Sequence, residues 1–361
     1  MLKQYKPTLD KLTKIVGKSH VLIDEQDTRH YRQGIRFGEG KVLAVVCPGT
    51  LLEQWQALQT IIEADCVVIM QAANTGLTGG STPYGDEYDR PVIIMSTRRL
   101  QGIQVILDGK QVVCLPGATL DNLERTLKPY NREPHSVIGS SCIGASVLGG
   151  VCNNSGGALV RRGPAYTEMA LYARVNESGE LELINHLGID LGNTAEEILT
   201  RLQKQDYETG QVTTQTTQLA SDNRYAHDVK QVDADSPARF NADPTRLYEA
   251  SGSAGKVCVF AVRLDTFEKV ESKVFYIGSN DHDDLTAIRR YLLTSLPSLP
   301  IAGEYIHRDA FSIGAKYGKD TFLFIERFGT VNIPRALALK DRIDGWLEKI
   351  KIRGLTDQIL Q

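Results

Sequence analysis

Short apolar runs and one amphipathic stretch alternate at the start of the chain. Residues 42–47 and 66–70 are rich in β-branched side chains and have the length of buried strands. Between them, Thr50 and Glu53 have the spacing of a capping box, which marks the start of a helix. The buried stripe predicted for this helix consists of Leu52, Trp55, Leu58 and Ile62. This strand–helix–strand order predicts mixed α/β structure.

The pattern farther along the chain predicts strands joined by tight turns, with helices between them. Strands are predicted at 92–96, 103–107, 111–115, 172–176, 181–185, 256–264 and 274–277. Helices are predicted at 8–16, 120–127, 194–202, 281–293 and from Pro334 onward. The segment 204–231 is rich in Gln, Thr and Asp and poor in apolar residues, which favours a mobile surface excursion.

A loop of residues with little or no side chain, 71–81, follows the predicted strand at 66–70. Its glycines admit positive φ and let the backbone approach a ligand closely. Successive backbone N–H groups in such a loop form an anion-binding concavity, so we interpret the loop as a pyrophosphate cradle. A polar surface turn is the alternative, because Gly and Asn are common in turns. Neither a G-x-G-x-x-G nor a G-x-x-x-x-G-K-[ST] pattern is found here, which argues against a Rossmann fingerprint and a P-loop.

A second tract of small residues extends from 139 to 150 and continues at 153–157. A tightly packed helix or strand pair would also explain one such tract, because small side chains permit close contact. Two tracts in one domain favour a long dinucleotide such as FAD, which needs backbone surfaces along its whole length.

Composition and charge exclude several classes of protein. The apolar content of 42% and charged content of 24% are ordinary for a soluble globular protein. The formal net charge of −3 gives no reason to expect nucleic acid as a partner. No run of eighteen or more apolar residues is present, so we expect no membrane span. The six cysteines lack CxxC spacing and the seven histidines are scattered, so we expect reduced cysteines and no metal site.

The two tracts carry a resemblance to a known family. The stretches 71–83 and 133–157, with 163–169 behind them, resemble the flavoprotein D-lactate dehydrogenases. These are respiratory, quinone-reducing enzymes of bacteria, within the larger vanillyl-alcohol-oxidase/p-cresol-methylhydroxylase-type FAD-binding fold. The resemblance extends from about Leu9 to about Lys351 and implies an α+β fold. The expected parts are an FAD-binding domain at 1–264, a partial cap (substrate) domain at 265–303 and a partial membrane-binding segment at 304–361.

The resemblance also implies which residues hold FAD, without a covalent link. From the first tract these are Ala72, Ala73, Asn74, Thr75, Gly76, Gly80 and Ser81. From the second tract they are Gly139, Ser146 and Gly156. Val259, in the predicted strand at 256–264, is expected near the cofactor, with plain core packing as the alternative.

The implied reaction is oxidation of D-lactate, or a similar 2-hydroxy acid, to pyruvate, with hydride transfer to FAD and electron transfer to a ubiquinone-type membrane quinone. Family members continue beyond Gln361, and their catalytic groups come from the cap and C-terminal portion, so we assign no catalytic residue. A truncated, catalytically inactive FAD-binding relative is therefore the alternative. For the adjacent His307 and Arg308, a surface or structural role is expected.

The implied location is peripheral, on the cytoplasmic side of the cell inner membrane. The helix predicted from Pro334 has six basic and three acidic side chains between Arg335 and Arg353, and it contains Trp346. Such a helix can lie on an anionic membrane surface, which is the expected partner. A cytoplasmic location is the alternative if the shorter chain has lost membrane binding.

Overall fold

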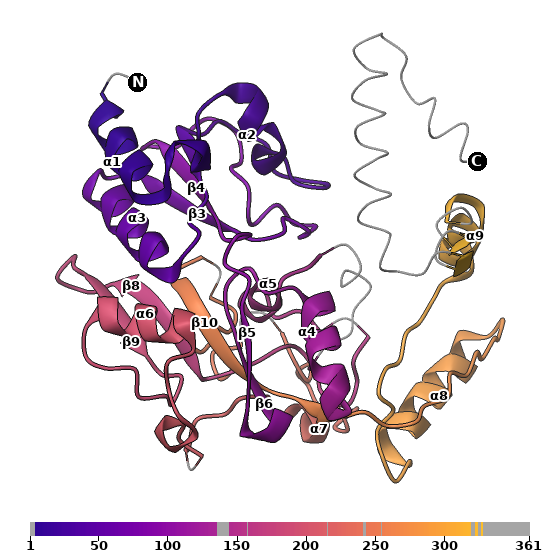
Figure 1. The fold of residues 1–361 in the computed structure, drawn as a ribbon. Helices are drawn as coiled ribbons and strands as arrows, with labels where there is room; N and C mark the ends of the chain where they lie inside the picture. The colour runs from indigo at the N-terminus through magenta and orange to yellow at the C-terminus, as the bar shows by residue number, and fades with distance from the viewer. Residues whose placement is uncertain are drawn as a thin grey trace.

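The computed structural model of the chain describes residues 4–135, 144–156, 158–214, 216–240, 243–253, 255–318, 322–323 and 326–327. These residues form two β-sheets packed around helix α3 (Leu51–Glu63). Two further helices, α8 (His282–Thr294) and α9 (Arg308–Tyr317), lie to one side of this body (Figure 1). The separate sheets and helices confirm the predicted α+β class.

The first sheet contains four strands in the order β1-β2-β4-β3. Strands β2, β4 and β3 are parallel, and β1 is antiparallel to β2. Helix α1 ends at Gly17, whose φ of +87° favours glycine, as the sequence pattern predicts. The elements of this half are α1 (Lys6–Val16), β1 (Val21–Leu22), α2 (Glu25–Arg32), β2 (Ala44–Val46), β3 (Val67–Gln71) and β4 (Val92–Ser96).

The second sheet is antiparallel throughout, in the order β5-β6-β10-β8-β9. Its strands are β5 (Ile103–Ile106), β6 (Gln111–Cys114), β8 (Ala170–Val175), β9 (Leu181–Asn185) and β10 (Cys258–Asp265). A small sheet pairs β7 (Arg132–Glu133) with β11 (Phe267–Glu268). The remaining helices are α4 (Leu120–Leu127), α5 (Val147–Cys152), α6 (Ala195–Lys204) and α7 (Tyr225–Asp228). Single 3-10 turns occupy Lys18–His20, Leu107–Gly109, Lys128–Tyr130 and Thr209–Gln211.

Two hydrophobic clusters lie on opposite faces of the second sheet. The larger cluster joins α1, α3 and α6 to the first sheet and to one face of the second, where Phe260 is fully buried. The smaller cluster packs α4 and α5 against the other face, where Val259 and Tyr172 lie. Val259 and Ala261 are two residues apart and would share a face in a regular strand, but a register shift between them places them in different clusters.

Helix α3 joins the two sheets through a buried amide. The Gln54 side chain is fully buried, and its Nε2 donates to the carbonyl of Val259 in β10 at 3.3 Å. The buried face of the helix is shifted by one residue from most of the expected stripe: Leu51 and Ile61 are buried, and Leu52, Trp55 and Ile62 are only partly so. Leu58 is buried as predicted. The sequence stripe missed this because it treated Gln54 as polar surface.

The predicted cap of α3 is half confirmed. Thr50 Oγ1 accepts from the backbone N–H of Glu53 at 3.1 Å, as a capping box requires. The Glu53 carboxylate, however, accepts from the N–H of Gly49 at 2.6 Å, one residue before the cap.

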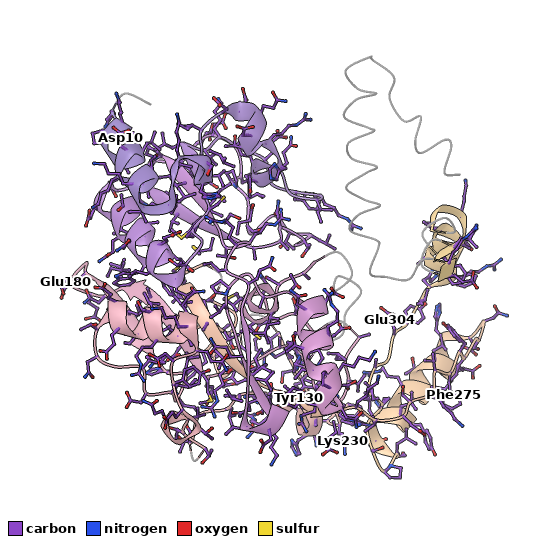
Figure 2. The ribbon with its side chains drawn as sticks, in the orientation of Figure 1. Asp10, Tyr130, Glu180, Lys230, Phe275 and Glu304 are labelled. Carbon is purple, nitrogen blue, oxygen red and sulfur yellow. The ribbon has the colours of Figure 1, made fainter. Side chains whose placement is uncertain are left out.

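Two predictions in the later part of the chain are wrong. No strand forms at 274–277 within the described structure; Val274, Phe275 and Tyr276 are instead highly exposed, and Phe275 points outward (Figure 2). A strand needs a pairing partner, which local apolar pattern does not supply. The polar segment 204–231 is not a free excursion, because Val212, Ala220 and the Asp222 side chain are buried. The helix predicted from Pro334 lies outside the described residues.

None of the helices in the described part of the chain is long and apolar enough to cross a membrane. Within the same residues, no group of three or more His, Cys, Asp or Glu side chains is placed to hold a metal ion.

Candidate functional site

The first tract leaves the end of β3 as a loop whose own side chains fix its shape. Asn74 adopts φ of +54°, and its Nδ2 donates to the carbonyl of Gln33 at 2.8 Å. Ser81 Oγ donates to Asn74 Oδ1 at 2.9 Å, which ties the two ends of the loop together. The buried Gln71 side chain donates to the carbonyls of Tyr31 and Ser81. Side chains therefore hold this loop from within.

The loop 33–40, which follows α2, supports the first tract from behind. Gly38 and Gly79 both have positive φ, of +90° and +74°. A Cβ on Gly79 would lie 2.8 Å from the carbonyl oxygen of Phe37, and one on Gly38 would lie 1.9 Å from Thr82 Oγ1. The sequence analysis did not identify this support, although the closely spaced glycines 34, 38 and 40 were a signal of it.

The backbone of the first tract has unpaired hydrogen-bond donors. Among the described residues, no backbone N–H from Ala72 to Ser81 has a hydrogen-bond acceptor. These residues are partly or fully exposed, and a Cβ on Gly76 or Gly80 would meet nothing within 4 Å. A run of free, accessible amides around side-chain-free positions fits an anion such as a pyrophosphate. The chemistry of this loop is therefore compatible with FAD.

The second tract is described from 144 to 156, so Gly139 lies outside the described residues. Ser146 caps α5, where its Oγ accepts from the N–H of Gly149 at 3.0 Å. The N–H of Val147 donates to the carbonyl of Ala118 at 2.9 Å, which fixes the start of the tract beside the turn that follows β6.

A short chain of hydrogen bonds links the two tracts. The carbonyl of Gln71, where the first tract begins, accepts from the N–H of Thr97 at 2.8 Å. Thr97 Oγ1 donates to the carbonyl of Pro116 at 3.3 Å, two residues before the Ala118 carbonyl that holds Val147. The structure therefore ties both tracts to the same turns between the two sheets, and their contact with one cofactor stays a prediction.

Gly156 and Val259 have packing roles that the structure shows directly. A Cβ on Gly156 would lie 3.0 Å from the Cα of Pro164, so close packing excludes a side chain there. Val259 is buried in the cluster beneath α4 and α5. Their contact with a cofactor stays a prediction.

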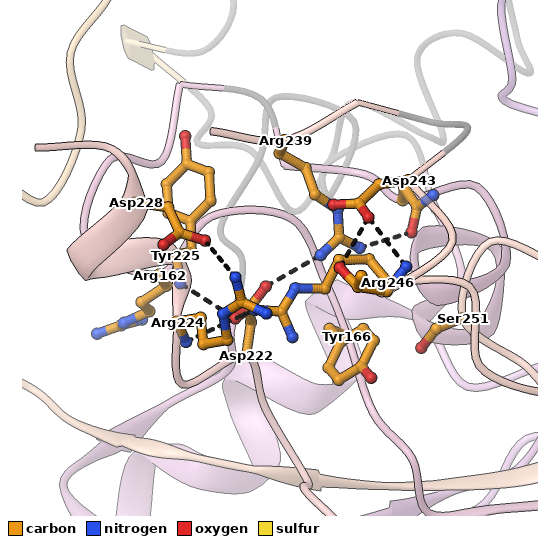
Figure 3. Close-up of polar contacts among 12 residues, drawn as sticks. Arg162, Tyr166, Asp222, Arg224, Tyr225, Asp228, Arg239, Asp243, Arg246 and Ser251 are labelled. Atoms are coloured by element: carbon orange, nitrogen blue, oxygen red, sulfur yellow. Dashed lines mark hydrogen bonds and ion pairs between the residues drawn. The ribbon is translucent and has the colours of Figure 1, made fainter. Parts of the chain in front are cut away.

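A buried cluster of charged side chains lies next to the second tract and was missed by the sequence analysis (Figure 3). The Asp222 side chain is 1% exposed and pairs with Arg239 at 3.0 Å and Arg246 at 3.2 Å. Arg239 Nη2 also donates to Oδ1 of Asn154, in the second tract, at 3.0 Å. Both guanidinium groups lie over the Tyr166 ring. Local sequence pattern does not predict such a cluster, because its members are far apart in the sequence.

Two histidines have environments that bear on chemistry. His307 is exposed and caps α9, where its Nδ1 accepts from the N–H of Asp309 at 3.2 Å, so the expected structural role is confirmed. His135 is 5% exposed and borders a small cavity between α4, α5 and β10 with room for about one water molecule. Its Nδ1 has no hydrogen-bond partner among the described groups. Burial lowers the pKa of His135 to about 4.

We expect His135 to make the protein less stable below pH 6.5. The unfolded chain binds a proton on this side chain near its ordinary pKa of 6.5, whereas the folded protein resists protonation down to about pH 4. Stability is therefore lost as the pH falls through this window, by roughly 3 kcal/mol at its lower end. Urea unfolding between pH 7.5 and 4.5 measures the loss. His135→Gln, which cannot titrate, should lose less; equal losses in both proteins would contradict the assignment.

Comparison with known proteins agrees with this geometry. Residues 42–182 match the family model described as FAD binding domain, and residues 274–361 match D-lactate dehydrogenase, membrane binding. The quinone-dependent D-lactate dehydrogenase of Haemophilus influenzae is 60% identical over 337 residues, which cover 93% of this chain and 60% of the relative. That of Escherichia coli is 55% identical over 359 residues, which cover 99% of this chain and 63% of the relative.

Among solved structures, an alkyldihydroxyacetonephosphate synthase superposes with a TM-score of 0.48 at 12% identity, covering 73% of this chain and 41% of that chain. This likeness is too weak to support an assignment, which rests on the two family models and the curated relatives. The chain spans about three fifths of the length of those relatives. It is similar to quinone-dependent D-lactate dehydrogenases over nearly its whole length, and it matches an FAD-binding family model followed by a membrane-binding one.

Proposed function

We propose that this chain binds FAD between its two tracts and supplies the flavin-binding part of an enzyme that oxidises D-lactate to pyruvate and reduces a membrane quinone. The observation that carries the proposal is the run of unpaired, accessible backbone N–H groups at 72–81. The homology to quinone-dependent D-lactate dehydrogenases supports the substrate and the acceptor.

The chain's own residues hold the cofactor chiefly through the backbone. Ala72, Ala73, Asn74, Thr75 and Gly76, followed by Gly80 and Ser81, offer main-chain amides to the pyrophosphate. The Asn74 and Ser81 side chains bond each other, so they shape the loop and leave the amides free. When bound, FAD supplies a two-electron acceptor, which the oxidation of a 2-hydroxy acid requires. The second tract contributes Gly139, Ser146 and Gly156, with Val259 close by.

The remaining parts of the proposal concern the division of the chain into domains and the surface that meets the membrane. We assign residues 1–264 to the FAD-binding domain, 265–303 to a partial cap and 304–361 to a partial membrane-binding segment.

Highly exposed apolar side chains, including Phe275, Tyr276 and Phe311, support a contact surface in the part of the chain after residue 264. We propose that it meets an anionic leaflet on the cytoplasmic side of the inner membrane. Flotation with phosphatidylglycerol vesicles, but not with neutral phosphatidylcholine vesicles, is the expected result, and equal flotation would contradict the anionic preference.

The absorbance spectrum of the purified protein, supplemented with FAD and freed of excess, tests the proposal. We expect a flavin band. Its bleaching by D-lactate in the absence of oxygen, with L-lactate leaving it unchanged, would support dehydrogenase activity in the chain itself. A flavin band that D-lactate does not bleach would contradict the dehydrogenase activity and support an inactive FAD-binding relative. A protein that retains no FAD would contradict the whole proposal.

A further inference from the structure

We propose that Arg239 is a positioning residue for the cofactor site. Together with Asp222, it holds Asn154 and thereby keeps the end of the second tract in its FAD-binding shape. This inference rests on the proposed function, because it assumes that the second tract contacts FAD. It assigns a role to the polar segment around Asp222, which neither the sequence motifs nor the family resemblance explains.

The end of the second tract has little structure of its own to hold it. Helix α5 is only six residues long, and Asn154, two residues beyond it, takes the left-handed conformation with φ of +51°. The backbone there is tied by hydrogen bonds from the N–H groups of Asn153, Asn154 and Ser155 to the carbonyls of Gly149, Val151 and Gly150. Ala165 N–H also donates to the carbonyl of Ser155. Asparagine adopts this conformation more readily than other residues with a side chain, and contacts from outside the tract define the direction of its carboxamide.

Arg239, 85 residues farther along the sequence, provides such a contact. Its Nη2 donates to Asn154 Oδ1 at 3.0 Å. Its Nη1 pairs with Asp222 Oδ2 at 3.0 Å (Figure 3). The guanidinium side chain is only 7% exposed and stacks over Tyr166, with 5.5 Å from Cζ to the ring centroid. One planar group therefore bridges an amide and a carboxylate in fixed geometry, which a lysine ammonium does not reproduce.

Asp222 is itself held rigidly, so it is a firm anchor for Arg239. Its Oδ1 accepts from the backbone N–H groups of Arg224 at 2.8 Å and Tyr225 at 3.1 Å. The same oxygen lies 3.2 Å from Nη2 of Arg246. With backbone donors and two guanidinium groups around one buried carboxylate, the charge is compensated and its position is defined.

The other side of Asn154 is closed by Gly252. A Cβ on Gly252 would lie 2.7 Å from Asn154 Nδ2, and Gly252 N–H donates to the carbonyl of Val151, the residue whose carbonyl also accepts from Asn154. The Asn154 carboxamide is therefore held between Gly252 and Arg239, with its oxygen directed to the guanidinium. Only one of its two flipped orientations satisfies this contact.

The competing explanation is that the Asp222–Arg239 pair only stabilises the fold. The small net stability expected from a buried ion pair argues against it. A buried ion pair often contributes little stability compared with apolar residues of similar volume, because desolvation offsets the attraction. A fixed carboxamide orientation at the end of the tract, by contrast, is something that only a directional hydrogen bond from Arg239 provides.

The test compares FAD affinity with ligand-free stability in four variants. FAD dissociation constants are measured by quenching of flavin fluorescence, and the Tm is measured without FAD. We expect Asn154→Ala, Arg239→Lys and Arg239→Met each to weaken FAD binding about tenfold. Asn154→Ala should lower the Tm only slightly, because its side chain is partly exposed, although alanine tolerates φ of +51° less well than asparagine and Arg239 loses one acceptor. Arg290→Gln is the control and should leave FAD affinity unchanged, because the Arg290–Asp233 ion pair is well exposed and involves no residue of the Asp222 cluster.

The double variant Arg239→Met/Asn154→Ala should bind FAD no more weakly than either single variant, since both remove the same contact. FAD affinity like that of the unchanged protein in Asn154→Ala and Arg239→Lys would overturn the inference and leave the pair with a stabilising role only. If Arg239→Met fails to fold, Asn154→Ala alone decides. Failure of the unchanged protein to bind FAD would instead overturn the proposed function itself.

Discussion

Replacing Asp222 with alanine is expected to lower the free energy of unfolding by about 3–5 kcal/mol. The substitution leaves the guanidinium groups of Arg239 and Arg246, only 7% and 8% exposed, without the carboxylate that pairs with them. Their charges would then remain buried without compensation, or the segment would have to open to hydrate them. A single domain has about 5–15 kcal/mol of stability in all, so the change should be evident in the urea midpoint.

Asp233→Ala provides the matched control. The Asp233 carboxylate also pairs with an arginine, Arg290, at 2.7 Å, but both side chains are well exposed. Solvent screens such pairs, so this variant should unfold at the same urea concentration as the unchanged protein. Equal midpoints for the Asp222 and Asp233 variants would show that the Asp222 cluster is not the buried anchor described above.

Gly79→Ala is expected to destabilise the first tract by about 3 kcal/mol and to weaken FAD binding with it. Two effects add, because Gly79 has φ of +74° and its new Cβ would lie 2.8 Å from the backbone oxygen of Phe37. A backbone oxygen cannot rotate away as a side chain can, so loop 33–40 must separate from the tract. The Tm without FAD and the FAD dissociation constant measure the two consequences.

Gly80→Ala is the matched control for the Tm effect of Gly79→Ala. A Cβ on Gly80 would meet nothing within 4 Å, and its φ is not in the left-handed region, so Gly80→Ala should leave the Tm of the ligand-free protein unchanged. A lowered Tm for Gly80→Ala, or an unchanged one for Gly79→Ala, would contradict the packing of loop 33–40 against the first tract.

Local pattern was sufficient for elements that carry their own signal. The β-branched run ending at Ser96 forms a central strand at the predicted bounds, and the strands predicted at 103–107 and 111–115 form the hairpin of β5 and β6. Local pattern was insufficient where burial depends on a distant partner. The fully buried Gln54 faces β10, more than 200 residues away, and the run at 274–277 has no pairing strand in the described structure.

The same distinction applies to the site. The first tract can be recognised in the sequence because anion binding through the backbone requires several small residues in succession. The Asp222 cluster cannot be recognised in the sequence, because Arg239 lies 17 residues from Asp222 and 85 residues from Asn154. These side chains meet only after folding. Polar composition suggested free surface for that segment, whereas paired charges allow its burial.

Hydrogen–deuterium exchange with and without FAD tests most directly whether both tracts hold one cofactor. The main-chain N–H groups at 72–81 have no acceptor in the described structure, so they should exchange fast in the ligand-free protein. Added FAD should slow exchange in peptides covering 72–81 and in peptides covering 144–156, with one FAD per chain at saturation. Protection confined to one of these stretches, or absent from both, would contradict the convergence of the two tracts on a single flavin nucleotide.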